Sequence, residues 1–163
     1  MTINIVPYKK LYCKPAINIW NQVVSEGKAF PQTVQLTQES GDTFFCAQSF
    51  TGIALDSASD EVVGVYTLHP NNVGRCGHIC NASYAVDQEL RGQRIGEALV
   101  RDCMVQAKTL GFRILQFNAV VKTNLVALGL YQKLGFTQLG IIPGGFQLDD
   151  GSYEDIIPHY IAL

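Results

Sequence analysis

Residues 91–97, RGQRIGE, form the stretch that decides the fold. They follow residues 79–86, ICNASYAV, a run that is apolar and small enough to be a buried strand. They lead into residues 95–110, where apolar side chains recur at the spacing of a helix with one buried stripe. A tight turn between a strand and a helix leaves backbone N–H groups pointing at one spot, with the positive end of the helix dipole behind them.

A phosphate or pyrophosphate group suits that spot, and Arg91 and Arg94 add positive charge to it. The alternative is an ordinary strand-to-helix turn with solvated arginines. The stretch alone does not decide between the two, because glycine-bearing turns are common.

The composition predicts one globular domain, residues 1–163. A net charge of −2 and a pI near 5.9 argue against a sequence-independent nucleic-acid binder. No apolar run approaches the ~18–20 residues that span a bilayer, and residues 1–10 lack the apolar core of a signal peptide. The five cysteines show no metal-ligand spacing, so we expect small residues of a reducing, cytoplasmic environment and no metal.

Apolar periodicity divides the chain into strands and helices. Two predicted strands flank the polar turn DSASD (56–60) and predict a hairpin. Strands that alternate with helices after residue 79 predict a mixed sheet whose later strands are parallel. Residues 143–152, PGGFQLDDGS, predict a loop or a hairpin tip with Asp150-Gly151 as its turn. The predicted strands are 3–6, 49–55, 61–68, 79–86, 113–121, 136–142 and 154–162, and the predicted helices are 10–25, 36–45, 95–110 and 124–134.

Residues with special backbone preferences support these boundaries. Gly27 is expected to close the first helix, and Thr37 to cap the second. Asn124 caps the last predicted helix and Gly135 ends it. Pro158 interrupts the last strand, which predicts a bulge or an edge position.

Residues 124–136, NLVALGLYQKLGF, are the second informative stretch. Taken alone, Tyr131 has an ordinary interpretation as a half-buried core aromatic. Together with VDQELRGQRIGEAL (86–99), however, this stretch resembles the GNAT superfamily of acetyl-CoA-dependent N-acetyltransferases. The earlier piece is similar to the family's Q/R-x-x-G-x-G/A pyrophosphate loop, and the later piece to its N-x-x-A-x-x-L-Y-x-x-x-G-F motif. The resemblance implies an α/β fold with a mixed central sheet of about six or seven strands and about four helices.

The resemblance also implies roles for individual residues. The loop would wrap the pyrophosphate of coenzyme A, and the backbone of the preceding strand would pair with its pantetheine arm. The Val86 N–H would face the thioester oxygen as an oxyanion donor. Tyr131 would lie near the thioester sulfur as general acid for the departing thiolate. The coenzyme-binding residues would be Tyr84, Ala85, Val86, Arg91, Gly92, Gln93, Arg94, Ile95, Gly96, Asn124 and Tyr131.

Arg94 departs from the family pattern, which has glycine at this position. Glycine there lets the backbone approach phosphate closely. We expect Arg94 to serve only with a negative φ, so that its side chain reaches a phosphate.

The sequence contains fewer recognisable residues for binding and deprotonating the amine substrate. Many relatives carry a glutamate on the central strand as general base, whereas residues 79–81 here read ICN. Cys80 is a candidate base or nucleophile, although a buried bystander fits a thiol there better. The base is then water, which Asn81 holds, or the substrate enters as the free amine.

Asn118 lies on the predicted strand where the family usually has an apolar residue, and a buried amide must find a partner. It is either a core asparagine that bridges backbone groups or a ligand for the substrate. The stretches CNASYAVD, QFNAVVKTN and LGFTQLGIIPGG resemble the subgroup that acetylates proline analogues such as azetidine-2-carboxylate. In that subgroup, asparagines at the positions of Asn81, Asn118 and Asn124 line the substrate site. Tyr131 departs from some of those relatives, which have tryptophan.

We therefore predict an enzyme that moves the acetyl group of acetyl-CoA directly to the amine of a small molecule, an amino acid or an amino-acid analogue. Tyr131 and Asn81 would be catalytic, and Asn81 and Asn118 would bind the substrate. The predicted partners are acetyl-CoA as co-substrate and a small amine, with no metal, nucleic acid or membrane, and a homodimer is among the expected assemblies. A protein N-terminal or lysine acetyltransferase and a non-catalytic acyl-CoA-binding sensor remain as alternatives.

Overall fold

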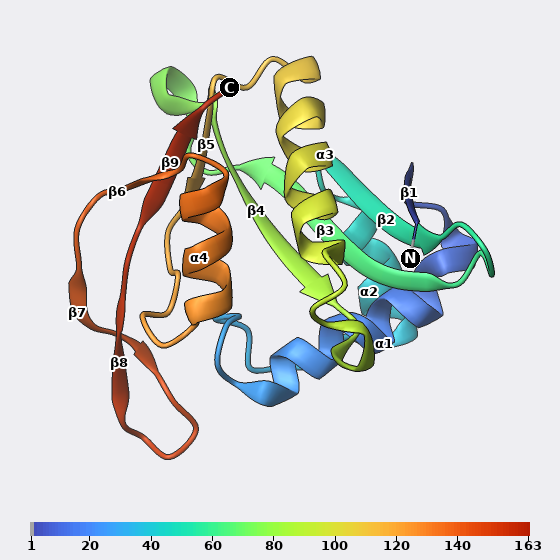
Figure 1. Cartoon of the computed structure of the whole chain (residues 1–163), viewed down its shortest axis with the longest axis horizontal. Coiled ribbons are helices and arrows are strands. Elements are labelled where there is room, and N and C mark those ends of the chain that lie inside the picture. The colour runs from blue at the N-terminus through green and yellow to red at the C-terminus, as the bar shows by residue number, and fades with distance from the viewer. Residues whose placement is uncertain (1) are drawn as a thin grey trace.

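A seven-stranded sheet runs through residues 2–163, the part of the chain that the computed structural model describes (Figure 1). Its strand order is β1-β2-β3-β4-β5-β9-β6, and a separate two-stranded sheet pairs β7 with β8. Met1, the first residue of the predicted domain, lies outside the described residues. The strands are β1 (Ile3–Pro7), β2 (Phe50–Asp56), β3 (Val62–Pro70), β4 (Ile79–Val86), β5 (Ile114–Phe117), β6 (Thr137–Gln138), β7 (Ile142–Gln147), β8 (Tyr153–Ile156) and β9 (His159–Ala162).

Helices cover both faces of this sheet, as the mixed α/β prediction requires (Figure 1). One core lies between the sheet and the helices α3 and α4, and it includes Leu99, Leu115 and Phe117. The other lies between the sheet and the helices α1 and α2, around Trp20 and Val65. The α-helices are α1 (Cys13–Glu26), α2 (Gln38–Cys46), α3 (Ile95–Thr109) and α4 (Leu125–Lys133), and the 3-10 helices are η1 (Lys10–Tyr12), η2 (Gly74–Cys76) and η3 (Gln88–Leu90).

The predicted helix ends are confirmed by their backbone geometry. Gly27 follows α1 in the left-handed conformation, with φ +60°. Thr37 caps α2 reciprocally with Ser40: the Ser40 N–H donates to Thr37 Oγ1 at 3.2 Å, and the Thr37 N–H donates to Ser40 Oγ at 2.9 Å. Trp20, expected in the core, is 1% exposed.

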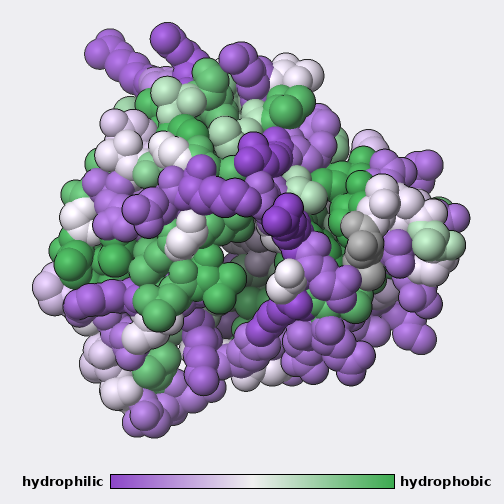
Figure 2. Space-filling view, viewed as in Figure 1, coloured by the Kyte–Doolittle hydropathy of each residue, from purple (hydrophilic) through white to green (hydrophobic). Residues whose placement is uncertain are grey.

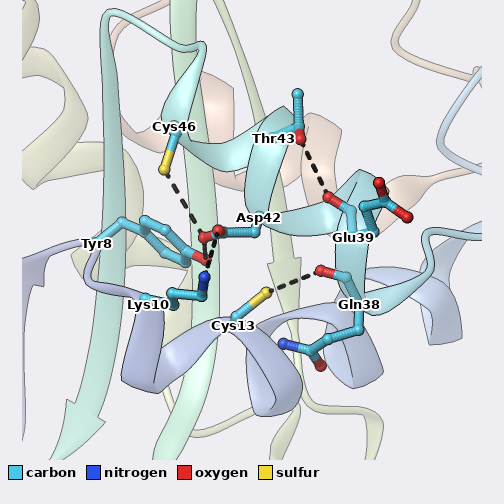
Figure 3. Close-up of polar contacts among 8 residues, drawn as sticks. All are labelled: Tyr8, Lys10, Cys13, Gln38, Glu39, Asp42, Thr43 and Cys46. Carbon is cyan, nitrogen blue, oxygen red and sulfur yellow. Dashed lines mark hydrogen bonds and ion pairs between the residues drawn. The ribbon is translucent and has the colours of Figure 1, made fainter.

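Asp42 ties α2 to the segment between β1 and α1 (Figure 3). The Tyr8 hydroxyl donates to Asp42 Oδ1 at 2.8 Å, and Lys10 Nζ lies 3.6 Å from Oδ2. The Cys46 thiol donates to the same Oδ1 at 3.8 Å. These contacts therefore link α2 to the segment that leads into α1.

The prediction that the later strands run parallel is wrong for all but one pair of the described chain. β4 and β5 are parallel, because α3 crosses over between them, whereas β9 is antiparallel to both β5 and β6. After α4 the chain enters the sheet as β6, leaves it through the β7–β8 hairpin and returns as β9 in the opposite direction.

Two predicted strands are also too long. The strand predicted at 113–121 ends at Phe117, where the chain bends, and the strand predicted at 136–142 shrinks to β6. The predicted loop 143–152 begins within β7, while its turn at Asp150-Gly151 is confirmed, with Gly151 at φ +83°. Pro158 separates β8 from β9, and these two strands belong to different sheets.

Gly27 permits a close contact between the end of α1 and the β7–β8 hairpin. A Cβ at this position would lie 2.8 Å from Oδ2 of Asp149, and the positive φ adds strain for any other residue. We expect Gly27→Ala to lower the free energy of unfolding by about 1–2 kcal/mol, measured by urea denaturation. Gly129→Ala is the matched control, because Gly129 lies exposed in α4 and an added Cβ would have no atom within 4 Å. This variant should have a free energy of unfolding higher than that of the wild type by about 0.5–1 kcal/mol. Equal effects of the two substitutions would contradict this account.

Candidate active site

The candidate site lies where β4 and β5 separate. These strands pair only at Ile79↔Ile114 and Cys80↔Leu115, although β4 continues to Val86. β3 pairs with β4 from Cys80 to Val86 on the other side. In the described chain, the edge of β4 that faces β5 is therefore open beyond Cys80.

Alternation along β4 shows which backbone groups line the open edge. The Asp87 N–H donates to the Val63 carbonyl of β3 at 3.1 Å, so the groups of Ala85 also point to β3. The N–H and C=O groups of Tyr84 and Val86 then point to the open edge. Of the three residues predicted to pair with pantetheine, Tyr84 and Val86 offer their backbone groups there and Ala85 does not.

The turn before α3 brings free N–H groups to the mouth of this opening. Arg94 is the N-cap residue of α3 and adopts φ +64°, so the expectation of a negative φ is wrong. Arg94 thus takes the left-handed conformation that the family's glycine adopts easily. It makes no side-chain capping bond, which leaves the first N–H groups of α3 available to a ligand.

Gly96 lies where three elements meet. A Cβ on Gly96 would approach Leu130 of α4 and Val86 of β4, both at 3.9 Å. Figure 2 shows the surface hollowed in this region, between α4 and the end of β4. The predicted loop, the end of β4 and α4 therefore converge on one place.

Two of the charged side chains around the turn, Arg91 and Glu97, form ion pairs. The Arg91 guanidinium lies 2.7 Å from the Glu26 carboxylate of α1, so it is engaged in an ion pair. Glu97 bridges α3 to α4 through Lys133 at 2.6 Å and to Arg101 at 2.9 Å. The bonds to Lys133 and Arg101 hold the pKa of the Glu97 carboxyl below its usual value.

Tyr131 projects from α4 into an aromatic cluster beside the opening. Its ring centroid lies 4.5 Å from that of Phe117, 5.3 Å from that of Phe136 and 5.7 Å from that of His159. Burial, with a smaller contribution from Cys103, raises the pKa of the Tyr131 hydroxyl above its ordinary value. The hydroxyl therefore stays protonated at neutral pH, as a general acid must before it reacts.

Two buried polar atoms near Tyr131 lack hydrogen-bond partners within residues 2–163, namely Tyr84 Oη and His159 Nε2. His159 Nδ1 donates to the Ile157 carbonyl at 2.7 Å, which leaves Nε2 as an acceptor. Burial lowers the pKa of His159 and raises that of Tyr84, so both side chains are neutral.

Asn124 performs the capping role that its position predicts. Its Oδ1 accepts a hydrogen bond from the Ala127 N–H at 3.1 Å, which starts α4. The side-chain NH₂ group remains for a further partner.

A group of four side-chain amides, here termed the amide cluster, lies on the face of the sheet opposite Tyr131. Asn81 and Gln116 alternate with the residues of β4 and β5 that contact α3 and α4, so they point to the other face. Asn71 joins them, because its Oδ1 accepts from Asn118 Nδ2 at 2.6 Å and from Asn81 Nδ2 at 3.5 Å. The cluster consists of Asn71, Asn81, Gln116 and Asn118.

The structure corrects the expectation for Asn118. It was predicted within a strand and buried, but it lies exposed just after β5. Its partners are the side chains of Asn71 and Gln116, not backbone groups. The interpretation of Asn118 as a buried asparagine that bridges backbone groups is therefore wrong.

Sequence reasoning missed Asn71 and His69. Asn71 directly follows β3, and its backbone N–H donates to the Ile79 carbonyl at 2.8 Å, which holds it beside β4. His69 pairs in register with Asn81, so both side chains face the same side. The signal available was the HPNN turn at residues 69–72 directly before β4, a pattern that predicts a turn and carries no mark of a site.

Cys80 takes the core role that was favoured for it. It is fully buried, and its thiol donates to the Ile114 carbonyl at 3.2 Å. Burial raises the pKa of the thiol to about 12, so it is not a nucleophile at neutral pH.

The thiols are free at all five cysteines, and Cys13, Cys80 and Cys103 are buried. Within the described residues, His, Cys, Asp and Glu side chains form no group of three that could hold a metal ion. The helices of residues 2–163 are all too short or too polar to cross a membrane.

Solved structures share this fold over nearly their whole length. A GCN5-related N-acetyltransferase from Kribbella flavida superposes with a TM-score of 0.89 at 30% identity, over 99% of this chain and 98% of that one. A GNAT superfamily phosphinothricin acetyltransferase from Sinorhizobium meliloti, solved in complex with acetyl-CoA, gives a TM-score of 0.90 at 19% identity, over 100% of this chain and 89% of that one. The fold is therefore that of the GCN5-related N-acetyltransferases.

Sequence comparison identifies the family. The chain is 30% identical over 156 residues to the N-acetyltransferase aca1 of Schizosaccharomyces pombe, which covers 86% of this chain and 74% of that protein. The model of the acetyltransferase (GNAT) family matches residues 20–136. The chain belongs to the GNAT family, and it is an acetyl-CoA-dependent N-acetyltransferase. The open edge of β4 and the free N–H groups of α3 fit acetyl-CoA as co-substrate.

The left-handed conformation of Arg94 has a measurable consequence. Arg94→Gly and Arg94→Ala both remove the guanidinium, so their comparison isolates the backbone. Glycine adopts a positive φ without the steric cost that alanine bears, and we expect the glycine variant to be more stable by about 1 kcal/mol in urea denaturation. Equal stability of the two variants would mean that φ is negative in solution.

Proposed function

We propose that this enzyme acetylates the amine of a small amino acid or amino-acid analogue. The observation that carries the proposal is the amide cluster, which sits across the sheet from Tyr131. Neutral amides suit a small polar substrate better than the cationic tail of a lysine or a polyamine. The Sinorhizobium meliloti relative is named for phosphinothricin, itself an amino-acid analogue, and this supports the same substrate class.

For the coenzyme, we propose that its pyrophosphate binds at the free N–H groups of the turn and α3. The Tyr84 and Val86 backbone groups would pair with the pantetheine arm, and the Val86 N–H would donate to the thioester oxygen. The side-chain NH₂ group of Asn124 would donate a hydrogen bond to the coenzyme. The proposed binding residues are Tyr84, Val86, Asn124, Tyr131 and, through the backbone of the turn and the start of α3, Arg91, Gly92, Gln93, Arg94, Ile95 and Gly96.

The reaction would proceed by direct transfer. The amine nitrogen attacks the thioester carbonyl carbon, and the tetrahedral intermediate collapses with cleavage of the C–S bond. The Tyr131 hydroxyl gives its proton to the departing thiolate, which leaves as the thiol of coenzyme A. The amine proton passes to a water that Asn81 orders, and His69, on the same side of the strand pair, can take it from that water. His69 Nδ1 donates a hydrogen bond to the Pro70 carbonyl at 3.0 Å, so Nε2 is left as the proton acceptor.

The substrate class is tested by a thiol-release screen over amino acids, amino-acid analogues, polyamines and peptides. Amino acids or their analogues should react fastest, and far faster acetylation of peptides or polyamines would overturn the proposal. In the same assay, Asn118→Ala should mainly raise KM, because its contact exists before the transition state as well as in it. Asn81→Ala should mainly lower kcat, because the water that it orders acts on the developing ammonium. Asn72→Ala is the control, because Asn72 lies next to the cluster and its side chain accepts a hydrogen bond from the Val73 N–H instead.

The coenzyme site is tested at Gly96 with a matched pair of substitutions. Acetyl-CoA at about 100 times its Kd should stabilise the wild type by about 2.7 kcal/mol, seen as a rise in Tm. Gly96→Asp should abolish this rise because it places negative charge beside the pyrophosphate, whereas the neutral Gly96→Asn should retain part of it. An added Cβ has room at this position, so both variants should fold. The same Tm rise in both would remove this loop from the coenzyme site.

Tyr131→Phe tests the general acid. It keeps the ring among Phe117 and Phe136 and deletes the proton, so we expect kcat to fall roughly 10²-fold with little change in acetyl-CoA affinity. Because burial raises the pKa of Tyr131, wild-type kcat should show no loss centred near the ordinary value of 10.0. Tyr12→Phe at the start of α1 is the control. Full activity of Tyr131→Phe would return this residue to a core role.

A further inference from the structure

We propose that Asn71 is a positioning residue that makes the amide cluster selective for amines carrying a carboxylate. This inference rests on the proposed function and adds a residue that the sequence motifs do not include. Asn71 is half-buried, follows β3, and reaches two side chains from different elements, Asn81 on β4 and Asn118 after β5. It is therefore the member of the cluster that connects the two proposed substrate ligands.

The hydrogen bonds within the cluster occupy the side-chain oxygens of Asn71 and Asn118. Asn71 and Asn118 form a reciprocal pair, in which Asn118 Nδ2 donates to Asn71 Oδ1 at 2.6 Å and Asn71 Nδ2 donates to Asn118 Oδ1 at 3.3 Å. A second donor reaches each oxygen, since Asn81 Nδ2 lies 3.5 Å from Asn71 Oδ1 and Gln116 Nε2 lies 2.9 Å from Asn118 Oδ1. An amide oxygen has two lone pairs, so both oxygens are saturated.

What remains for a ligand differs between the two ends of the cluster. The NH₂ groups of Asn71 and Asn118 each have two hydrogens and donate one of them within the cluster. With their oxygens saturated, these two residues present only N–H donors to a ligand. A carboxylate, which only accepts hydrogen bonds, matches that end. Asn81 Oδ1 makes no hydrogen bond within residues 2–163, and it can accept from the N–H of an amine. The cluster thus has a donor end for a carboxylate and an acceptor for the neighbouring amine, which is the pattern of an amino acid.

Asn71 fixes this polarity because a side-chain amide has two nearly isosteric ends. Gln116 contacts the oxygen of the exposed Asn118 amide, whereas Asn71 contacts both its oxygen and its NH₂ group. Loss of Asn71 would remove the contact that distinguishes the two ends, and rotation of Asn118 would present its oxygen to the ligand and repel a carboxylate. The reciprocal pair with Asn71 holds the oxygen inward. Selectivity for a carboxylate therefore depends on a residue that need not touch the substrate.

The test compares Asn71→Asp with Asn72→Asp on a matched pair of substrates. The twenty amino acids, azetidine-2-carboxylate and phosphinothricin are screened first with the wild type, and the fastest is then compared with its carboxamide. Asp at 71 still accepts from Asn118 and Asn81 but no longer donates to Asn118 Oδ1, and it adds negative charge at the donor end. We expect KM for the amino acid to rise at least about tenfold and KM for the carboxamide to stay within about threefold, with kcat on both little changed.

Asn72→Asp carries the same charge change one residue away, and its side chain keeps the bond to the Val73 N–H. It should leave the ratio of the two KM values unchanged. The inference is overturned if the two Asp variants give the same ratio, or if Asn71→Asp impairs both substrates equally, as a merely structural role would. Should Asn71→Asp not fold, Asn118→Asp at the exposed partner position must give the same selective rise in KM. A wild type that acetylates no amino acid would instead overturn the proposed function itself, and this inference with it.

Discussion

The separation of β4 from β5 is the constraint on which the rest of the structure depends. Two register pairs hold the strands together, and beyond Cys80 no strand within residues 2–163 lies beside the backbone of β4 on that edge. Backbone N–H and C=O groups are costly to leave unpaired away from water, so an open edge inside a domain calls for a ligand. α3 follows β4 and α4 follows β5 in the chain, so both helices begin beside the same opening.

Local patterns predicted the elements well where the signal itself is local. The alternation within residues 79–86 and the caps at Thr37 and Asn124 depend on the residue and its near neighbours, and the structure confirms them. The direction of β9 and the early end of β5 depend on which strand becomes the neighbour. Periodicity does not show the direction or the partner of a strand, because parallel and antiparallel pairs can have the same apolar pattern.

The candidate site divides in the same way. The motif located the turn before α3 and Tyr131, but it did not predict the positive φ of Arg94, because arginine rarely adopts one unless its surroundings require it. Asn71 and His69 escaped prediction because the register between β3 and β4 brings them beside Asn81. Motifs mark residues that are close in sequence, whereas this part of the site is assembled from three separate strand ends.

The placement of Tyr131 and the amide cluster on opposite faces of the sheet bears on how molecules would come and go. With the proposed roles, the nucleotide-bearing substrate and the amine approach through separate entrances and meet only between β4 and β5. Neither product then has to wait for the other to dissociate. An inhibitor shaped for the amide side would compete with the amine and leave the coenzyme entrance free, so it could discriminate among enzymes that all use the same acyl donor.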